Sequence, residues 1–390
     1  MNVVPLAFHS PKALRDALTA HGWDPAAAAA AAGGSDPLAF HIHDLDQATL
    51  ESLVRFAGHL GLEVLTGDGW AILAGSRSRL SALARPWTAP EELRALSTAV
   101  GLAIPPDPAT VWRTGRVVIP LERPVLMGIL NVTPDSFSDG GRHVGVDAAR
   151  THAAQLAHDG ATIVDVGGES TRPGRDGLVP EAEELRRVIP VIEAIVRDLP
   201  DVAVSVDTVK SAVARAALDA GAAIVNDVTA LRHDPAVATA AARAGAGLVL
   251  MHSRGPLADI ASYAHADYGG DPVAGVRAEL AAALSTAVDA GMPVDAIVVD
   301  PGLGFSKTPE QNMLVCDRLA VLLSLGRPIL VGPSRKRFIG VMTGLDTAER
   351  DRASATVCAL AWERGARLFR VHDVALTREA LAVAYGIGGP

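Results

Sequence analysis

From Val125 onward, short apolar runs alternate with longer stretches whose apolar residues recur at helical spacing. The runs are VLMGILNV, TIVDVGG, VAVSVDT, AAIVNDV, GLVLMH, AIVVDPG, PILVGPS and LFRVHDV. Nearly every position in them is apolar, which is typical of parallel strands buried on both faces. The segments between them can each form a helix, for example EAEELRRVIPVIEAIVRDL. Eight strand–helix units are the number in a (β/α)8 TIM barrel, and we predict this α/β fold for residues 114–390.

The same alternation could also build an open, doubly wound sheet. Such sheets that bind dinucleotides carry a glycine-rich fingerprint after the first strand, and the sequence lacks it. It also lacks the GxxxxGK[ST] loop of enzymes that use ATP. The pattern therefore favours the barrel, and it disfavours ATP-driven phosphoryl transfer.

Residues 1–113 have a different pattern and predict a small α/β domain. LAFHIHDL is typical of a strand, ATLESLVRFAGHLGLE of an amphipathic helix, and EVLTGDGWAILAG of a hairpin that turns at GDG. The segment IPPDPAT is a proline-rich hinge before the barrel. His41 and His43 alternate along the strand and could share one face. We interpret them as surface or edge-strand histidines rather than as a metal site.

Composition narrows the class of protein. The chain of 390 residues is 49% hydrophobic, so a large core is possible, and its net charge of −9 disfavours a nucleic-acid surface. Cys316 and Cys358 provide neither a disulfide framework nor metal-ligand spacing, and we expect both in the core. The N-terminus lacks a signal-peptide pattern, and no apolar run is long enough to span a membrane. We therefore expect a cytoplasmic protein with no membrane partner.

Polar residues follow every predicted strand of the barrel. They are Asn131, Glu169, Thr171, Arg172, Asp207, Asn226, Asp227, His252, Asp300, Ser334, Lys336, Arg370, His372 and Asp373. Any one of them could be a helix cap or a turn residue. In a barrel, however, the carboxyl ends of the strands meet at one mouth, where barrel enzymes have their active sites. Repetition at all eight strands therefore predicts a polar pocket.

The residue types in this pocket indicate the chemistry of its ligand. Asp207, Asn226 and Asp300 offer acceptor oxygens, which need N–H donors or a cation when they are buried. A flat heterocycle with ring N–H and amino groups would supply those donors. Lys336 and Arg370, with His372, suit an anion such as phosphate. The sequence thus predicts a ligand with a donor-rich ring at one end and phosphate at the other.

Seven segments at these strand ends resemble those of dihydropteroate synthases, in the same order. They are NVTPDSFSDGG, VGGESTRPG, SVDT, VNDV, DPGLGFSKT, GPSRKRFIG and RVHDV. The resemblance covers roughly residues 115–386. It implies that 6-hydroxymethyl-7,8-dihydropterin diphosphate and 4-aminobenzoate condense to 7,8-dihydropteroate and diphosphate, a step of folate biosynthesis. Mg²⁺ would accompany the diphosphate.

The resemblance also implies roles for single residues. The pterin would be held by Asp207, Asn226, Asp300 and Lys336, with Val228 and Met251 as candidates for the apolar wall. The diphosphate would be held by Asn131, Arg370 and His372, with Asn131 also at Mg²⁺, and Arg370 could stack on the pterin.

The loops that begin at Thr133 and Gly167 would order over the site. Asp139 would stabilise a pterin-methylene cation, and Asp135 would help to order its loop. The 4-aminobenzoate site would be built from Thr171, Arg172, Pro173, Ser334 and Lys336. The catalytic set implied in this way is Asp139, Asp135, Lys336 and Arg370.

Two features depart from the resemblance. Ser253 stands where a methionine is more usual, and residues 1–113 form an extension outside the seven segments. Two other interpretations stay open at this point: a pterin-binding methyltransferase that works with a corrinoid partner, and a non-catalytic pterin-binding protein. A homodimer is possible, since a two-fold dimer is the commonest oligomer.

Overall fold

The computed structural model describes residues 2–6, 11–32, 37–85, 88–104, 109–132, 142–169 and 179–388. The chain divides into two compact units: one holds residues 1–107 together with 320–326, and the other holds residues 108–319 and 327–390. Each unit has an apolar core of its own. Among the residues described, no helix is both long enough and apolar enough to cross a membrane.

The N-terminal unit is an antiparallel sheet with helices on both faces. The strands run in the order β1-β2-β4-β3, with bounds β1 (Asn2–Pro5), β2 (Pro37–His43), β3 (Glu63–Gly67) and β4 (Trp70–Ser76). The helices are α1 (Pro11–Ala20), α2 (Pro25–Ala32), α3 (Gln47–His59), α4 (Arg77–Leu83), the 3₁₀ turn η1 (Glu91–Leu93) and α5 (Arg94–Ala103). Because side chains alternate along β2, Phe40 packs with Leu53 of α3, and Ala39 packs with Leu18 of α1. The predicted strand, helix and hairpin are confirmed.

The two histidines of β2 do share one face, but they are not on an edge strand. Strand β2 pairs with β1 on one side and with β4 on the other, so the expectation of an edge position is wrong. The rings of His41 and His43 lie 4.0 Å apart between centroids, and Trp70 packs edge-on against His41. Within the described part of the chain, no group of three or more His, Cys, Asp and Glu side chains could hold a metal ion.

The second unit is the predicted parallel barrel. Its eight strands close in the order β10-β11-β12-β13-β14-β7-β8-β9. Their bounds are β7 (Val125–Asn131), β8 (Ile163–Gly167), β9 (Ala203–Asp207), β10 (Ile224–Asp227), β11 (Gly247–Met251), β12 (Ile297–Asp300), β13 (Ile329–Val331) and β14 (Ala366–Val371). Every residue of β8 and β11 is buried, as their unbroken apolar runs predict.

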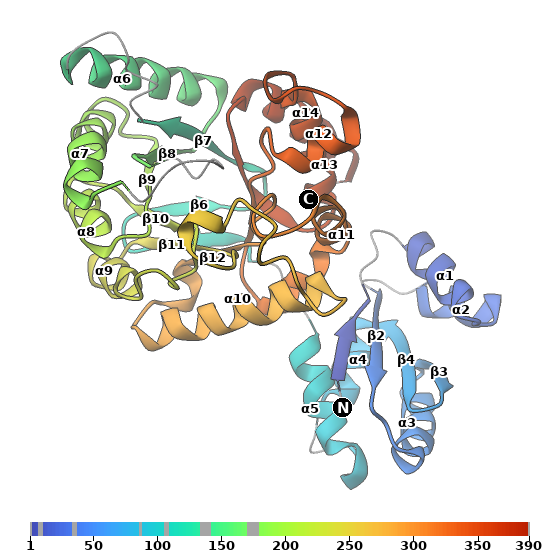
Figure 1. The fold of residues 1–390 in the computed structure, drawn as a ribbon. Coiled ribbons are helices and arrows are strands. Elements are labelled where there is room, and N and C mark those ends of the chain that lie inside the picture. The colour runs from blue at the N-terminus through green and yellow to red at the C-terminus, as the bar shows by residue number, and fades with distance from the viewer. Residues whose placement is uncertain are drawn as a thin grey trace. The chain divides into compact units, whose positions relative to one another are not determined.

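Helices follow the strands and surround the barrel (Figure 1). They are α6 (Arg142–Asp159), α7 (Glu181–Asp198), α8 (Ser211–Asp219), α9 (Ala236–Ala244), α10 (Pro272–Asp289), α11 (Pro309–Asp317), α12 (Arg337–Thr343), α13 (Asp351–Glu363) and α14 (Val374–Gly388). Short 3₁₀ turns are η3 (Leu257–Asp259), η4 (Val294–Ala296), η5 (Leu319–Leu325) and η6 (Thr347–Glu349). This arrangement leaves the carboxyl ends of the strands at one mouth.

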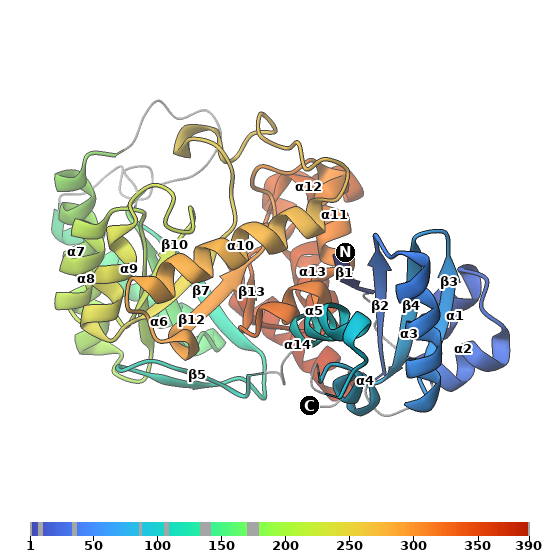
Figure 2. The ribbon, with the colours of Figure 1, turned by 90° about the horizontal axis from the view of Figure 1, so that it is seen from below.

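A short hairpin fills the opposite end of the barrel. Strand β5 (Val111–Arg113) pairs with β6 (Val118–Pro120), and Figure 2 shows β5 running along one end of the barrel. Trp112 is fully buried among apolar residues from the first halves of the strands, such as Ile224 and Leu330. Its indole N–H donates to the carbonyl of Ala296 at 2.9 Å. The end of the barrel away from the strand carboxyl ends is therefore closed by packing.

Candidate active site

Strand register brings three of the predicted site residues into line across four neighbouring strands. Asn131 is level with Gly167, Gly167 with Asp207, and Asp207 with Asn226. On the other side of the barrel, Met251 is level with Asp300. Since residues two apart on a strand share a face, these side chains lie above the inward residues of the apolar core. The sequence-predicted strand ends therefore meet at one mouth.

Arg370 ties three strands together across this mouth. Its Nε donates to Asp165 Oδ2 at 2.6 Å, and its Nη2 donates to Asp207 Oδ2 at 2.7 Å. Asn226 Nδ2 donates to the same Asp165 oxygen at 3.1 Å. Burial raises the pKa of Asp207, and the Arg370 guanidinium opposes that rise. The cation thus holds two carboxylates in the barrel interior.

Asp165 is a site residue that the sequence analysis missed. Its carboxylate is fully buried, and its second oxygen, Oδ1, is without a hydrogen-bond partner among the described residues. A signal was present, because one carboxylate interrupts the apolar run IVDV two positions before Gly167. Two positions along a strand means the same face, and a buried carboxylate needs a partner.

Asp300 and Lys336 are the second charged group of the mouth. Asp300 is almost fully buried, and its Oδ1 accepts the backbone N–H of Gly302 at 2.7 Å. Burial raises the pKa of Asp300 to about 6, although Gly302 and Lys336 oppose the rise. The Lys336 ammonium lies over the ring of Phe305, 3.5 Å from its centroid, and burial lowers the pKa of Lys336 to about 7. The two groups thus titrate near neutrality.

Phe305 belongs to an apolar wall beside these charges. Val228 and Met251 pack in one buried cluster with it, together with Val209 and Ile260. The sequence analysis named Val228 and Met251 as wall candidates, and the structure brings them together. A flat ring would find an apolar surface here next to polar groups.

Ser253, which departs from the resemblance, supports this wall from behind. Its Oγ donates to the carbonyl of Val228 at 2.8 Å and accepts from Arg232 Nη2 at 2.8 Å. The side chain is buried. The serine therefore adds a polar link between the loops after β10 and β11, and it does not disrupt the wall.

His372 is hydrogen-bonded to Ser334 through its backbone and its ring. Ser334 Oγ accepts the backbone N–H of His372 at 3.2 Å and lies 2.9 Å from Nδ1 of the ring. The hydroxyl can then donate to Nδ1, which leaves the ring proton on Nε2. Burial, with help from Arg335 and Arg370, lowers the pKa of His372 to about 3. At neutral pH the ring is therefore uncharged and offers one N–H donor.

Asn131 stands beside a gap that glycine creates. A Cβ on Gly167 would lie 3.6 Å from Asn131 Oδ1 and 3.7 Å from Asp207 Oδ2. Two side-chain oxygens thus lie near the place that a side chain at Gly167 would occupy. Mg²⁺ prefers oxygen ligands of this kind. The residues present fit a magnesium ion that is also held by a bound diphosphate.

Three of the strand-end residues have structural roles. Asp227 accepts from Thr229 N and Leu231 N, which fixes the turn after β10, and Asp373 caps α14 through Leu376 N. Glu169 accepts from Lys210 Nζ at 2.7 Å and from Val179 N at 2.9 Å. Asp227 and Asp373 thus have the turn and cap roles that a polar strand end can have, whereas Glu169 forms an ion pair.

Five of the predicted site residues cannot be placed in this pocket. Asp135, Asp139, Thr171, Arg172 and Pro173 lie outside the described residues. Their assignments stay predictions.

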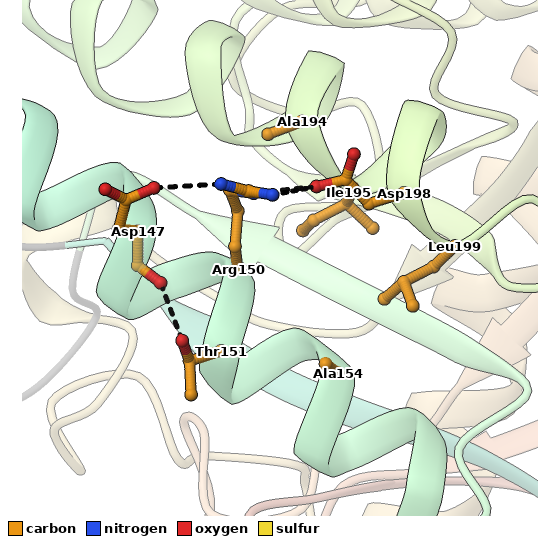
Figure 3. A pocket seen from close by; sticks show the side chains of 8 residues that line it. All are labelled: Asp147, Arg150, Thr151, Ala154, Ala194, Ile195, Asp198 and Leu199. Atoms are coloured by element: carbon orange, nitrogen blue, oxygen red, sulfur yellow. Dashed lines mark hydrogen bonds and ion pairs between the residues drawn. The ribbon is translucent and has the colours of Figure 1, made fainter.

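A separate groove lies between α6 and α7 and contains none of the strand-end residues. It has a volume of about 500 Å³ and is lined by Asp147, Arg150, Thr151, Ala154, Ala194, Ile195, Asp198 and Leu199. Figure 3 shows Arg150 stretched between the carboxylates of Asp147 and Asp198. Because its cation is already paired, we assign no ligand to this groove.

Comparison with known proteins identifies the barrel. Residues 127–372 match the family model of pterin binding enzymes. The chain is 45% identical to the dihydropteroate synthase of Bacillus subtilis over 65% of this chain and 85% of that protein. It is 46% identical to the dihydropteroate synthase of Mycobacterium leprae over 66% of this chain and 91% of that protein.

Solved structures agree with these relatives. Dihydropteroate synthase of Xanthomonas albilineans, solved with 4-aminobenzoic acid, matches with a TM-score of 0.66 and 45% identity over 72% of this chain and all of that one. The same enzyme solved with 7,8-dihydropteroate gives 0.62 and 44% over 71% of this chain and 97% of that one. The chain belongs to the dihydropteroate synthase family of pterin-binding transferases, and its activity is that of a dihydropteroate synthase.

Proposed function

We propose that the barrel mouth joins 4-aminobenzoate to the pterin methylene carbon of 6-hydroxymethyl-7,8-dihydropterin diphosphate. The C–O bond to the diphosphate breaks, and its electron pair leaves with the diphosphate. The amine nitrogen forms the new C–N bond and then loses a proton. The amine is already a nucleophile when neutral, so no covalent enzyme intermediate is needed. Solved relatives that hold 4-aminobenzoic acid and 7,8-dihydropteroate support this reaction.

The observation that carries the pterin site is the buried carboxylate of Asp300. One of its oxygens is held by Gly302 N, so the carboxylate has a fixed orientation, while Oδ2 can accept from a ligand. A pterin presents a ring N–H and an amino group along one edge, which suits two carboxylate oxygens. Asn226 and Asp207 would complete the polar edge, and Lys336 would donate to the pterin carbonyl. Val228 and Met251 would contact the flat ring.

Arg370, His372 and Asn131 are proposed to bind the diphosphate. Arg370 provides a permanent positive charge, and neutral His372 provides an N–H donor. Asn131 Oδ1 would be a ligand of Mg²⁺. When bound, this ion would neutralise charge on the leaving diphosphate. Because Arg370 is paired with Asp165 and Asp207, its guanidinium has a fixed orientation in the mouth.

The loop residues retain the roles that the resemblance implies. Asp139 is proposed to stabilise positive charge on the pterin methylene carbon, with Asp135 ordering its loop. Thr171, Arg172 and Pro173, with Ser334 and Lys336, are proposed to bind 4-aminobenzoate. Preorganised charge that acts mainly in the transition state is the most effective form of electrostatic catalysis.

One assay tests the reaction. Diphosphate release is measured with the pterin substrate and Mg²⁺, with and without 4-aminobenzoate. Release that requires 4-aminobenzoate and is matched by 7,8-dihydropteroate formation is the expected result. A folded enzyme that binds the pterin but releases no diphosphate would contradict the proposal.

A homodimer through α12, α13 and α14 is proposed as the assembly. Five large apolar side chains are exposed on these neighbouring helices: Val341, Met342, Leu360, Val383 and Ile387. Exposed apolar side chains on adjacent helices can form an association surface. Light scattering coupled to gel filtration should give a dimer. The change Val383→Glu should give a monomer. The control Val288→Glu, at an exposed position on α10, should leave the dimer intact.

A further inference from the structure

Lys307 is a fully buried lysine that the proposed reaction does not use. The loop after β12 folds around its ammonium group. The Nζ atom donates to the carbonyls of Gly302 and Phe305, each at 3.1 Å, and to Nδ1 of His252 at 2.9 Å. An ammonium has three N–H donors, and all three are used. Burial lowers the pKa of Lys307 to about 7, and these three acceptors stabilise its charged form.

The third acceptor, His252, is itself held from outside the loop. Because Nδ1 accepts from Lys307, the ring proton is on Nε2, which lies 3.0 Å from Glu279 Oε2 on α10. Burial and the neighbouring ammonium lower the pKa of His252 to about 3, so the ring stays neutral. Glu279 also accepts from Arg254. The position of the Lys307 ammonium is therefore fixed by α10 through His252.

The carbonyl that Lys307 binds belongs to the residue that orients Asp300. Gly302 accepts from Lys307 through its oxygen and donates its N–H to Asp300 Oδ1 at 2.7 Å. Gly302 has φ +65°, and a Cβ there would lie 1.9 Å from the carbonyl oxygen of His252. Glycine alone fits this close approach. Lys307, Gly302 and Asp300 thus form a continuous chain of hydrogen bonds.

We infer that Lys307 is a positioning residue for the pterin: through Gly302 it fixes the direction in which the Asp300 carboxylate meets the ligand. This inference rests on the proposed role of Asp300. Binding groups work best when buried neighbours lock their orientation, and a misaligned carboxylate loses the two-point contact. The ammonium does not touch the substrate in this arrangement.

The test measures pterin affinity by calorimetry in four folded variants: Lys307→Met, Leu330→Ala, Asp300→Asn and the double variant of Lys307→Met with Asp300→Asn. The ligand is 6-hydroxymethyl-7,8-dihydropterin diphosphate with Mg²⁺, and 4-aminobenzoate is left out. Lys307→Met removes the donors but keeps the length of the side chain, and affinity should fall about tenfold. Leu330→Ala, at the closed end of the barrel, is the control for lost stability and should leave affinity within about twofold. An equal loss in both variants would show a purely structural role.

A double-mutant cycle identifies the route of the effect. If Lys307 acts through Asp300, adding Lys307→Met to Asp300→Asn should weaken binding by only about twofold, because Asp300 has already lost its contact. Full additivity would overturn the inference. A wild-type-like affinity in Asp300→Asn would overturn the pterin site and this inference together. An effect of Asp300→Asn without one of Lys307→Met would overturn this inference alone.

A second pair of variants keeps Lys307 itself and covers the case that Lys307→Met does not fold. His252→Leu removes the acceptor of the ammonium, whereas His252→Asn places an amide oxygen near the position of Nδ1. Affinity should fall about threefold in the leucine variant and return to within about twofold in the asparagine variant. Equal affinities in the two variants would contradict the inference.

Discussion

The two ends of the barrel are built from the same eight strands, but one end is packed with apolar side chains and the other carries polar and charged ones. At the closed end, inward residues such as Ile224 and Leu330 pack against Trp112, and the only side-chain polar contact described for Trp112 is one hydrogen bond. At the mouth, two to four residues further along the strands, the inward residues are Asp207, Asn226 and Arg370.

The difference teaches where stability and chemistry lie. Burial of apolar side chains at the closed end stabilises the fold. Buried charges at the mouth destabilise it unless they are paired with an opposite charge. Arg370 pairs two carboxylates there, so the mouth remains folded before substrate binds. Changes at the closed end should therefore alter stability and spare activity, and changes at the mouth should do the reverse.

The largest expected effect is at the closed end. Trp112→Ala empties the space of a fully buried indole and should lower the free energy of unfolding by about 3–5 kcal/mol. Turnover measured well below the melting temperature should stay within about twofold of wild type. Urea titration and steady-state kinetics measure both. Val118→Ala, an exposed position in the same hairpin, is the matched control and should change stability by less than about 0.5 kcal/mol. A large loss of turnover in folded Trp112→Ala would remove the distinction between the two ends.

The next effect concerns the loop over the mouth. Asp139→Ala should lower kcat about 100-fold or more, because its charge is proposed to act in the transition state. Pterin affinity should change by only a few-fold, and Asp139→Asn should resemble the alanine variant, since both lack the charge. Turnover within about twofold of wild type would show that another group stabilises the cation.

Asp300→Asn tests the pterin site itself. One acceptor oxygen becomes an N–H donor, which then faces a ligand N–H. A buried mismatch of this kind costs about 1–3 kcal/mol, so pterin affinity should fall about tenfold or more. Calorimetry measures this loss, and the melting temperature checks the fold. Unchanged affinity would place the pterin elsewhere in the mouth.

The pH dependence of pterin binding should follow the same carboxylate. Burial raises the pKa of Asp300 to about 6 in the free enzyme, and the pterin N–H groups need the ionised form. The contribution of Asp300 to affinity is then fully present above about pH 7 and is lost as the pH falls through about 6, by roughly tenfold between pH 7 and pH 5. Asp300→Asn should lack this component. An equal acid loss in that variant would assign the titration to another group.

The barrel and most of its mouth could be predicted from the sequence, because unbroken apolar runs specify strands buried on both faces. Asn131, Asp207, Asn226, Asp300 and Arg370 stand at their carboxyl ends, where topology alone brings them together. Register and loop folding could not be predicted in the same way. Asp165 lies inside a strand, and only the register shows that Arg370 reaches it.

Lys307 and Trp112 are two further residues whose positions could not be predicted from the sequence. A lysine in a loop is expected in solvent, and only the folding of that loop around its ammonium reveals the burial. Trp112 follows a proline-rich hinge, so the sequence analysis assigned it to the extension of residues 1–113, although its indole packs in the barrel core. Contacts between residues far apart in the chain decide both cases.

The smallest expected effect is that of removing the N-terminal unit, provided the cut spares the closed end. A chain that begins at residue 108 keeps β5, β6 and Trp112, and its kcat should remain within about twofold of that of the full chain. The solved Xanthomonas albilineans enzyme supports this, because its whole length is matched by 72% of this chain. A chain that begins at Thr114 lacks Trp112 and should unfold at lower denaturant concentration while its folded fraction still turns over. Assays and urea titrations of both chains measure these effects. A folded chain from residue 108 that forms no 7,8-dihydropteroate would show that the extension contributes to the mouth.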